Sequence, residues 1–260
     1  MALLSVPETQ SRLEEVFGIC RFIVRSPYAE ESEVEPNLTE PETPHEAQSP
    51  VEAIDEVRKD LGLCERCLLC KDRTHIVFGS GPPRADVMVI GEAPGADEDE
   101  QGVPFVGASG QKLDAMLLNV LGLERDRVHV TNALKCRPAH NRVPNPEEIT
   151  SCRPFLLRQI RAVRPKILVL LGTIAVKAVF QDTAIGVSKL RGRWLDFEGV
   201  PVMPTFHPSF LLHQRKPGSE EGPQNLEYRK NTRLVWADLV EVRDRMDLLG
   251  IEHLTVTSRP

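Results

Sequence analysis

The chain has 260 residues and a mass of 29.1 kDa, which allows one large α/β domain or two small ones. Its 41% of apolar and 27% of charged residues are typical of a soluble globular protein. The sequence has no run of 18 apolar residues that could span a membrane, and its start does not resemble a secretory signal. The net charge of −6 is concentrated in residues 1–60, with 14 acidic and 5 basic residues, so the remainder is mildly basic and compatible with DNA binding.

Residues 1–50 differ in composition from the rest of the chain. Apolar residues at helical spacing predict a short amphipathic helix over residues 9–25. Residues 26–50 contain five prolines, many glutamates and almost no large apolar side chains, so we expect a disordered linker there. This acidic extension is a candidate binding segment for a protein partner.

The rest of the chain alternates apolar strands with helices, and we assign one domain to residues 51–250 and a tail to residues 251–260. Helices are expected over residues 51–62, 109–121, 146–162, 173–180 and 231–248, and strands over residues 86–91, 128–132, 166–171 and 201–206. Because such alternation is typical of parallel sheets covered on both faces, the pattern predicts a three-layer α/β/α fold around a central four-stranded, mainly parallel sheet.

Side chains that can carry chemistry stand where these strands end. Glu92 and Ala93 follow the first strand, Asn132 closes the second, and His207 follows the fourth. Ligands of open parallel sheets bind beyond the carboxyl ends of the strands. We therefore expect a carboxylate, an amide and an imidazole to converge on a single crevice.

The segment over residues 91–110 has five glycines, which let the backbone approach a ligand closely. It is acidic at residues 97–100 and has no lysine for a phosphate, which favours an uncharged heterocycle as the ligand. Phe105 has two interpretations: it fills the core under this loop, or it offers its ring as a stacking face for a base.

Asn132 and His207 each have a structural and a functional interpretation. An asparagine at a strand end commonly caps the next turn, but its amide also offers the donor and acceptor that suit the edge of a pyrimidine. A single histidine at a strand end is usually structural, whereas in a crevice with Asn132 and Glu92 it becomes a candidate to stabilise developing negative charge.

Four cysteines form two pairs, Cys64 with Cys67 and Cys136 with Cys152. Two thiolates at C-x2-C spacing are a usual pair of metal ligands, and the second pair flanks a proline-rich, basic loop. Four thiolates suit either a structural zinc ion or an iron–sulfur cluster, and spacing alone does not choose between them. Cys70 is left over as a spare thiol.

Five motifs, in order along the chain, resemble one known family: GEAPGADED at 91–99, PFVGASG at 104–110, TNALKCRP at 131–138, the cysteine after NRVPNPEEI, and HPS at 207–209. They resemble the family 4 uracil-DNA glycosylases, which carry an iron–sulfur cluster. The resemblance covers residues 63–239, and both cysteine pairs have the spacing of the family.

The resemblance implies a role for each matching position. Cys64, Cys67, Cys136 and Cys152 match the ligands of a [4Fe–4S] cluster. The substrate-binding positions are Glu92 and Ala93 against uracil, Phe105 stacked on the flipped base, Asn132 reading the uracil edge, and His207 near uracil O2.

The implied reaction is base-excision DNA repair, in which a hydrolase of the glycosidase type cleaves the N-glycosidic bond, releases free uracil and leaves an abasic site. Glu92 and His207 are the expected catalytic residues: His207 stabilises the departing anion, and Glu92, or alternatively an acid among residues 97–100, orients the water. A related branch has aspartate in place of Ala93, so strong general-base catalysis from that position is not expected. Residues 137–145 lack the insert of the branch that bonds covalently to DNA, so we expect turnover.

The DNA-contacting residues are expected just after the HPS motif. Leu211, Leu212, Arg215 and Lys216 are the candidate wedge and phosphate contacts. The segment 213–230 is longer than in the family. The substrate is uracil-containing DNA, single- or double-stranded, and we expect a cytoplasmic monomer.

Two further hypotheses come from other functional classes. One is a non-catalytic iron–sulfur module that binds DNA and is associated with replication or repair proteins through the acidic extension. The other is a zinc-stabilised hydrolase of free nucleotides, which the absence of a phosphate-binding lysine in the glycine-rich segment disfavours. The presence of Glu92, Phe105, Asn132 and His207 together favours the glycosylase.

Overall fold

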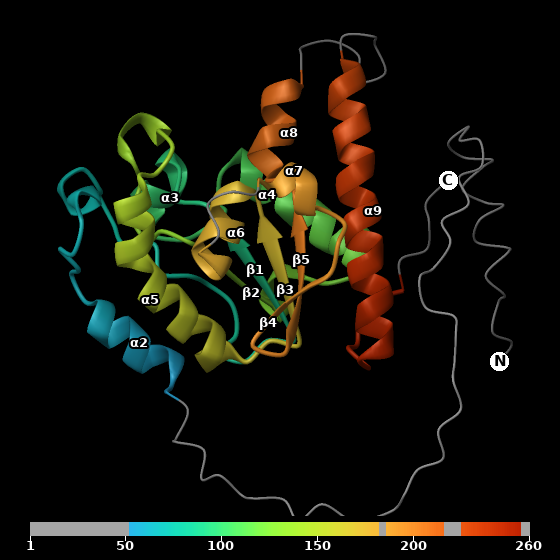
Figure 1. Cartoon of the computed structure of the whole chain (residues 1–260), viewed down its shortest axis with the longest axis horizontal. Coiled ribbons are helices and arrows are strands. Elements are labelled where there is room, and N and C mark those ends of the chain that lie inside the picture. The colour runs from blue at the N-terminus through green and yellow to red at the C-terminus, as the bar shows by residue number, and fades with distance from the viewer. Residues whose placement is uncertain (1–51, 182–185, 216–224, 256–260) are drawn as a thin grey trace, which may run out of the picture. The chain divides into compact units, whose positions relative to one another are not determined.

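The computed structural model describes residues 52–181, 186–215 and 225–255, all within one compact unit that spans residues 48–260 (Figure 1). The helix and linker that we predict within residues 1–50 lie outside the described residues. None of the described helices combines the length and the apolar character needed to cross a membrane.

The centre of the fold is a five-stranded sheet with the strand order β2-β1-β3-β5-β4. Its strands are β1 (Val87–Gly91), β2 (Val128–Asn132), β3 (Ile167–Leu171), β4 (Leu195–Phe197) and β5 (Val200–Thr205). The four predicted strands are present and parallel to one another. The edge strand β4 is antiparallel to β5, so the prediction of four strands was one short.

Helices cover both faces of this sheet (Figure 1). The predicted helices are found as α2 (Ile54–Leu61), α4 (Ala108–Met116) with its π-helical continuation η2 (Leu117–Leu121), α5 (Pro146–Val163), α6 (Thr173–Phe180) and α9 (Leu226–Leu248). Helices α3 (Ala96–Gln101), α7 (Val187–Leu190) and α8 (Pro208–Gln214), and the short turns η1 (Leu68–Lys71), η3 (Arg125–Arg127) and η4 (Ala139–Asn141), were not predicted. The three-layer α/β/α prediction is confirmed.

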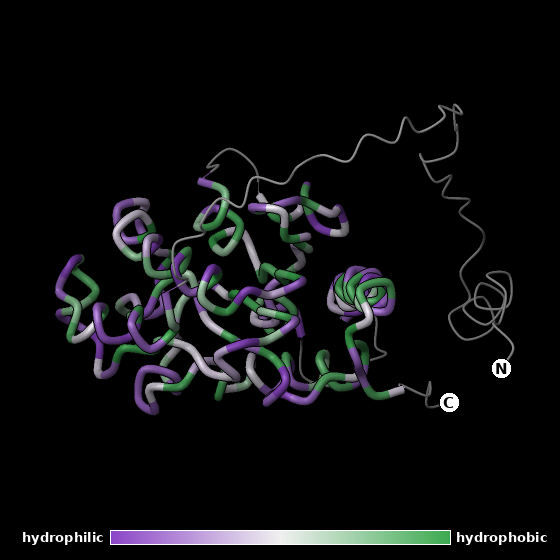
Figure 2. The backbone as a smooth tube through the Cα atoms, turned by 90° about the horizontal axis from the view of Figure 1, so that it is seen from below, coloured by the Kyte–Doolittle hydropathy of each residue, from purple (hydrophilic) through white to green (hydrophobic). Residues whose placement is uncertain are grey.

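Alternate strand residues supply two separate cores, one on each face of the sheet. Met88 and Ile90 of β1 pack in the core that contains residues of α2, α5 and α6. Val87 and Val89 point to the opposite core, which contains residues of α4, η2 and α9. Figure 2 looks along α9, whose turns alternate hydrophilic and hydrophobic residues, as expected for a helix with one buried face.

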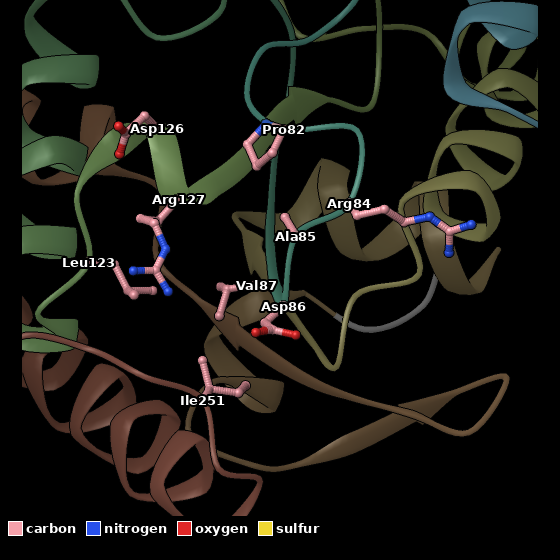
Figure 3. Close-up of a pocket in the computed structure, with 9 residues that line it drawn as sticks. All are labelled: Pro82, Arg84, Ala85, Asp86, Val87, Leu123, Asp126, Arg127 and Ile251. Atoms are coloured by element: carbon pink, nitrogen blue, oxygen red, sulfur yellow. The ribbon is translucent and has the colours of Figure 1, made fainter.

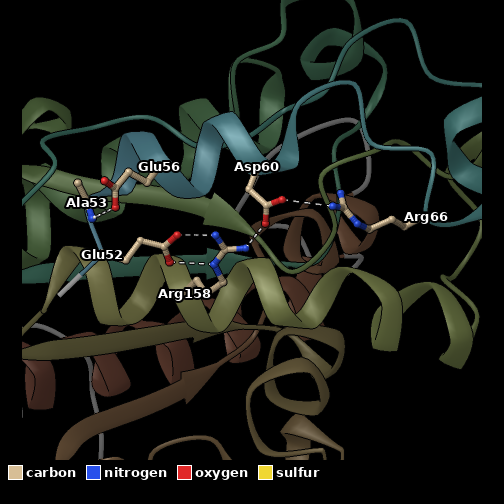
Figure 4. A network of polar contacts seen from close by, with 6 residues as sticks. All are labelled: Glu52, Ala53, Glu56, Asp60, Arg66 and Arg158. Carbon is tan, nitrogen blue, oxygen red and sulfur yellow. Dashed lines mark hydrogen bonds and ion pairs between the residues drawn. The ribbon is translucent and has the colours of Figure 1, made fainter. Parts of the chain in front are cut away.

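A network of charged side chains joins α2 to α5 (Figure 4). Arg158 of α5 bonds to both Glu52 and Asp60, and Asp60 also accepts from Arg66 at 3.4 Å. Partly exposed pairs of this kind contribute little stability individually, about 0–1 kcal/mol. Their geometric effect is to hold the segment that follows α2, which carries Cys64 and Cys67, against α5, which carries Cys152.

The described residues after α9, up to residue 255, pack against the domain. Ile251 is buried in the core beside α4 and α9, and the backbone N–H of Leu254 donates to the carbonyl of Gly122 at 2.9 Å. The boundary that we predict at residue 250 is therefore too early, because a single apolar residue such as Ile251 gives no periodic signal in the sequence.

Candidate active site

Asn132 and Phe105 meet over Gly91, where β1 ends. Gly91 pairs with Asn132 in the sheet, and a Cβ atom on Gly91 would lie 2.4 Å from Asn132 Oδ1 and 2.5 Å from Phe105 Cζ. Only glycine leaves room for both side chains at this point. Asn132 is buried, and its Oδ1 has no hydrogen-bond partner among the described residues. A buried polar atom without a partner costs free energy, which favours a ligand as its missing partner.

The loop that carries Phe105 is held by the side chains of Glu98 and Arg125, which bind its backbone groups. Phe105 has a φ of 56°, a left-handed conformation that is rare for a large side chain. The carboxylate of Glu98 in α3 accepts from the backbone N–H groups of Gly95, Val106 and Gly107 at 2.9–3.0 Å. Arg125 donates to the carbonyl of Pro104 at 2.8 Å. The ring of Phe105 is therefore presented by a rigid loop.

His207 lies against Phe105, with ring centroids 5.6 Å apart and an interplanar angle of 29°. Its Nδ1 accepts from the backbone N–H of Ser209 at 3.1 Å, so it caps the first turn of α8. A backbone N–H can only donate, so the proton of the neutral ring is on Nε2. Burial lowers the pKa of His207 to about 4, which leaves the imidazole neutral at physiological pH with one N–H to offer.

Glu92 and Ala93 lie beside Asn132. The backbone N–H groups of Ala133 and Leu134 donate to the carbonyls of Gly91 and Glu92, which draws the chain after β2 along the end of β1. The Glu92 side chain is partly buried, and this burial raises the pKa of its carboxyl above the ordinary value. Glu92 is thus the carboxylate adjacent to the predicted substrate site.

Two of the acids at positions 97–100 are structural. Glu98 holds the Phe105 loop, and Asp99 accepts from the backbone N–H of Thr74 at 3.0 Å with both oxygens. Both are buried. Among the acids at 97–100, the sequence did not distinguish Glu98, although a glutamate three residues after the N-cap residue Gly95 is typical of a side chain that binds backbone amides at a helix start.

The four paired cysteines line one cavity, which we call the thiol cavity: Cys64, Cys67, Cys136 and Cys152. They come from the segment after α2, the loop after β2, and α5. Cys70 lies in η1 and is not among the residues that line this cavity. The structure thus brings together the four residues that the spacing singles out, and Cys70, one turn after Cys67, does not line the cavity that they share.

Cations surround these thiols. Arg73 donates to Cys136 Sγ at 3.2 Å, and Arg66 and Lys135 also line the thiol cavity. Burial raises the pKa of the Cys152 thiol to about 11, whereas the nearby ammonium of Lys135 acts in the opposite direction. Burial in turn lowers the pKa of Lys135 to about 8. This surrounding charge suits a group of bound thiolates rather than four neutral thiols.

The donor set also bears on which group it fits. Among the described residues, no three His, Cys, Asp or Glu side chains are placed to hold a single metal ion. The four thiols that line the thiol cavity are donors that both a zinc ion and an iron–sulfur cluster accept.

The DNA-contact residues predicted after the HPS motif are only partly where we expected them. Leu211 is 0% exposed, packed in the core beside α4 and α9, so it cannot act as a wedge in this structure. Leu212 is half-buried, Arg215 is exposed, and Lys216 lies outside the described residues. Phe210 is 40% exposed instead, with its ring 4.9 Å from that of Phe206. The helical turn that starts at Pro208 rotates Leu211 inward and Phe210 outward.

A second cavity lies at the opposite ends of the strands (Figure 3). It is lined by residues that precede β1 and β2, among them Arg84, Asp86 and Asp126. Because ligands of parallel sheets bind at the carboxyl ends, this cavity is not the predicted site.

Comparisons with known proteins agree with the motifs. A family model described as the Uracil DNA glycosylase superfamily matches residues 78–239. The chain is 42% identical over 170 residues to a type-4 uracil-DNA glycosylase of Sulfurisphaera tokodaii, which covers 63% of this chain and 77% of that protein. It is 39% identical over 171 residues to a type-4 uracil-DNA glycosylase of Archaeoglobus fulgidus, which covers 63% of this chain and 85% of that protein.

One organism offers a comparison between two types. The chain is 42% identical to the type-4 uracil-DNA glycosylase of Pyrobaculum aerophilum, over 59% of this chain and 81% of that protein. It is 36% identical to the type-5 uracil-DNA glycosylase of the same organism, over 50% of this chain and 64% of that protein. The similarity is therefore higher and more extensive to the type-4 protein.

Proposed function

The chain belongs to the uracil-DNA glycosylase superfamily, and from this premise we propose that it is a DNA-repair enzyme that hydrolyses the N-glycosidic bond of uracil in DNA. The observation that supports this most directly is the meeting of Asn132, Phe105 and His207 at the end of β1, with Asn132 Oδ1 left without a partner. An aromatic face, an amide edge and a neutral imidazole donor are the groups that hold and polarise a flipped pyrimidine.

Asn132 is the group that identifies the base. Its Oδ1 accepts from the N3–H of uracil, and its amide nitrogen donates to a carbonyl on the same edge. Cytosine has no N–H at position 3, so it would leave Asn132 Oδ1 buried and unpaired. The stacking face of Phe105 is worth roughly 1–3 kcal/mol for a base and does not discriminate between bases.

His207 stabilises the departing base. Uracil leaves as an anion, and its O2 gains negative charge as the N-glycosidic bond breaks. The Nε2–H of the neutral imidazole donates a hydrogen bond to that oxygen, and no proton needs to be transferred. The Nδ1 bond from Ser209 already fixes the orientation of the ring. Backbone N–H groups near residues 92–93 add to the same stabilisation.

Glu92 orients the water that completes the reaction. As uracil departs, the sugar becomes oxocarbenium-like, the water oxygen bonds to C1′, and the proton that the water loses neutralises the uracil anion. The partly buried carboxylate of Glu92, next to the base site, can accept a hydrogen bond from this water and stabilise the positive charge of the sugar. Ala93, which stands where a related branch has aspartate, offers no side chain for this role.

The base must leave the duplex to reach these groups. Extrusion costs a few kcal/mol, least for a mispaired base, so uracil opposite guanine is the favoured duplex substrate. We propose Phe210 as the apolar residue that fills the space left in the duplex, because it is exposed, lies in the first turn of α8 after the N-cap residue His207, and packs its ring against that of Phe206.

Substituting Phe210→Ala is expected to lower uracil release from double-stranded DNA about tenfold and to leave release from single-stranded DNA nearly unchanged. The measurement is a single-turnover rate on matched oligonucleotides. Leu118→Ala, an exposed apolar residue of η2, serves as the matched control. Leu211→Ala should instead lower stability, by about 2–5 kcal/mol, since it leaves a cavity in the core. Equal losses on both substrates for Phe210→Ala would contradict the wedge role.

We further propose that Cys64, Cys67, Cys136 and Cys152 hold a [4Fe–4S] cluster. The shared thiol cavity and the cations of Arg66, Arg73 and Lys135 around it support this assignment. Such a cluster supplies a rigid, anionic cross-link between the start of the domain and the loop after β2. In this role the thiolates fix the protein around the substrate site, and the reaction itself proceeds on the residues named above.

Substituting Cys136→Ser is expected to remove most of the iron and the broad absorbance near about 400 nm, because three thiolates do not retain a cluster made for four. Cys70→Ser should leave both unchanged, since Cys70 does not line the thiol cavity. Iron analysis of anaerobically purified protein and its absorbance spectrum measure this. A colourless protein with stoichiometric zinc would overturn the cluster and restore the zinc alternative.

The function itself is tested with a labelled oligonucleotide that contains one uracil, followed by alkaline cleavage of the abasic site. Cleavage at the uracil position, and release of free uracil, are expected. Binding of the oligonucleotide without any cleavage would reject the glycosylase and favour a non-catalytic DNA-binding module. An oligonucleotide with thymine in the same place is the substrate control.

A further inference from the structure

Lys135 is a deeply buried cation that the reaction above does not use. It is 1% exposed, and no carboxylate pairs with it among the described residues. Its Nζ donates to Thr131 Oγ1 at 2.8 Å and to the backbone carbonyl of Asn132 at 2.5 Å. A buried ammonium without a counter-charge is strongly destabilising, so its retention at this position requires a nearby group that offsets the charge.

That offsetting group is the set of thiols. Lys135 precedes Cys136 in the chain and lines the thiol cavity together with Cys136 and Cys152, so thiolates held in that cavity can offset its charge. From this cavity its side chain reaches into the end of β2, where Nζ binds Thr131 and the carbonyl of Asn132.

Asn132 depends on its backbone for orientation. Its Oδ1 makes no hydrogen bond within the described protein, so nothing on that side fixes the amide before the substrate arrives. What the structure holds firmly is the peptide unit: Lys135 Nζ binds the Asn132 carbonyl, and Thr131 Oγ1 donates to the carbonyl of Phe78 at 2.8 Å. The bond from Lys135 Nζ to Thr131 Oγ1 joins these two anchors into one buried network.

We propose that Lys135 is a positioning residue that couples the thiol cavity to the uracil-reading amide of Asn132. The inference rests on the proposed function and deepens it, because it gives the cluster site a direct structural connection to base recognition. A cluster that offsets the charge of Lys135 keeps the ammonium in place, and the ammonium keeps the Asn132 peptide in place. A displacement of about 1 Å in a reading group is enough to cost roughly 100-fold in rate.

The test is the variant Lys135→Met, which preserves length and burial but removes the charge and the donors. We expect retained iron, a single-turnover rate of uracil release lowered about 10- to 100-fold, and inhibition by free uracil weakened by a similar factor. The affinity for DNA with a tetrahydrofuran abasic-site analogue should stay unchanged, because that ligand has no base to read. Lys59→Met, at an exposed lysine of α2, is the matched control. A wild-type rate and wild-type uracil inhibition in iron-loaded Lys135→Met would overturn the proposal.

Thr131→Val keeps the test decisive if Lys135→Met loses its iron. It removes one of the two acceptors of Lys135 Nζ without altering the thiol cavity, so we expect full iron content and a several-fold weakening of uracil inhibition. Unchanged uracil inhibition in Thr131→Val would assign Lys135 to the thiol cavity alone and overturn the coupling. If the unsubstituted protein releases no uracil, the proposed function itself is wrong. If the unsubstituted protein is active and both variants behave like it, the function stands and only the coupling role of Lys135 is wrong.

Discussion

Substituting Asn132→Ala is expected to lower uracil release by a factor on the order of 10² to 10³ while non-specific DNA affinity stays intact. The side chain is buried at the meeting point of β1, β2 and the Phe105 loop, and it supplies the hydrogen bonds that identify the base. Removing it leaves the uracil edge unpaired in the transition state, where such bonds are strongest. DNA contacts come from other surfaces, so binding of an undamaged duplex should not change.

The measurement is a single-turnover rate beside a binding isotherm for uracil-free DNA. Asn119→Ala, at an exposed asparagine of η2, is the control for a substitution of the same type. Parallel loss of rate and DNA affinity in Asn132→Ala would indicate damage to the fold. A rate within a few-fold of the unsubstituted enzyme would contradict the assignment of Asn132 as the reading residue.

Substituting His207→Phe is expected to lower the rate by about 10² to 10³, because it preserves the ring packing against Phe105 but removes the donor to uracil O2. Since burial depresses the pKa of His207 to about 4, its charge is constant between pH 5.5 and 8, roughly, and it should produce no titration there. The raised pKa of Glu92 instead predicts that the rate of uracil release falls on acidification at a pH above the ordinary carboxyl range, as Glu92 becomes protonated. This acid limb of the pH–rate profile should be absent in Glu92→Gln.

Ring nitrogen shifts in histidine-labelled protein check the tautomer directly. They should show Nδ1 as an acceptor and Nε2 as protonated for His207 throughout neutral pH. His253→Phe, which replaces a histidine bonded to Asp247 outside the site, is the activity control. A pKa near 6.5 for His207, or a rate unchanged in His207→Phe, would reject the neutral-donor role. Loss of the α8 cap alone would lower stability by about 1 kcal/mol without a specific effect on the chemical step.

Sequence patterns located most of the sheet because its strands are buried on both faces. β1 and β3 are nearly continuous apolar runs, and β2 is fully buried although it contains polar residues; the ends of β1 and β2 place Glu92 and Asn132 beside each other. The edge strand β4 was missed since its three residues are partly exposed and mixed in character. Such a strand is defined by its neighbour β5 rather than by its own composition.

The residues that sequence reasoning missed, or to which it gave another role, act through contacts distant in the chain. Leu211 and Phe210 are adjacent, and which of them faces the core depends on how α8 packs against α4 and α9, a property that a seven-residue helix does not encode in its own periodicity. Lys135 precedes Cys136 in the motif TNALKCRP, where a lysine would ordinarily be expected at the surface. Only the folded structure shows that its charge is buried. Glu98 was hidden among neighbouring acids, and only the folded loop shows which of them binds the backbone amides.

The left-handed backbone of Phe105 has a consequence for how this domain tolerates change. That conformation costs the fold roughly 1–3 kcal/mol, and Glu98 and Gly110 maintain it. A glycine at position 105 would relieve the cost and also delete the stacking ring. Selection for thermal robustness and selection for excision therefore act in opposite directions at this one position, which makes it a natural place for a stability–activity trade-off.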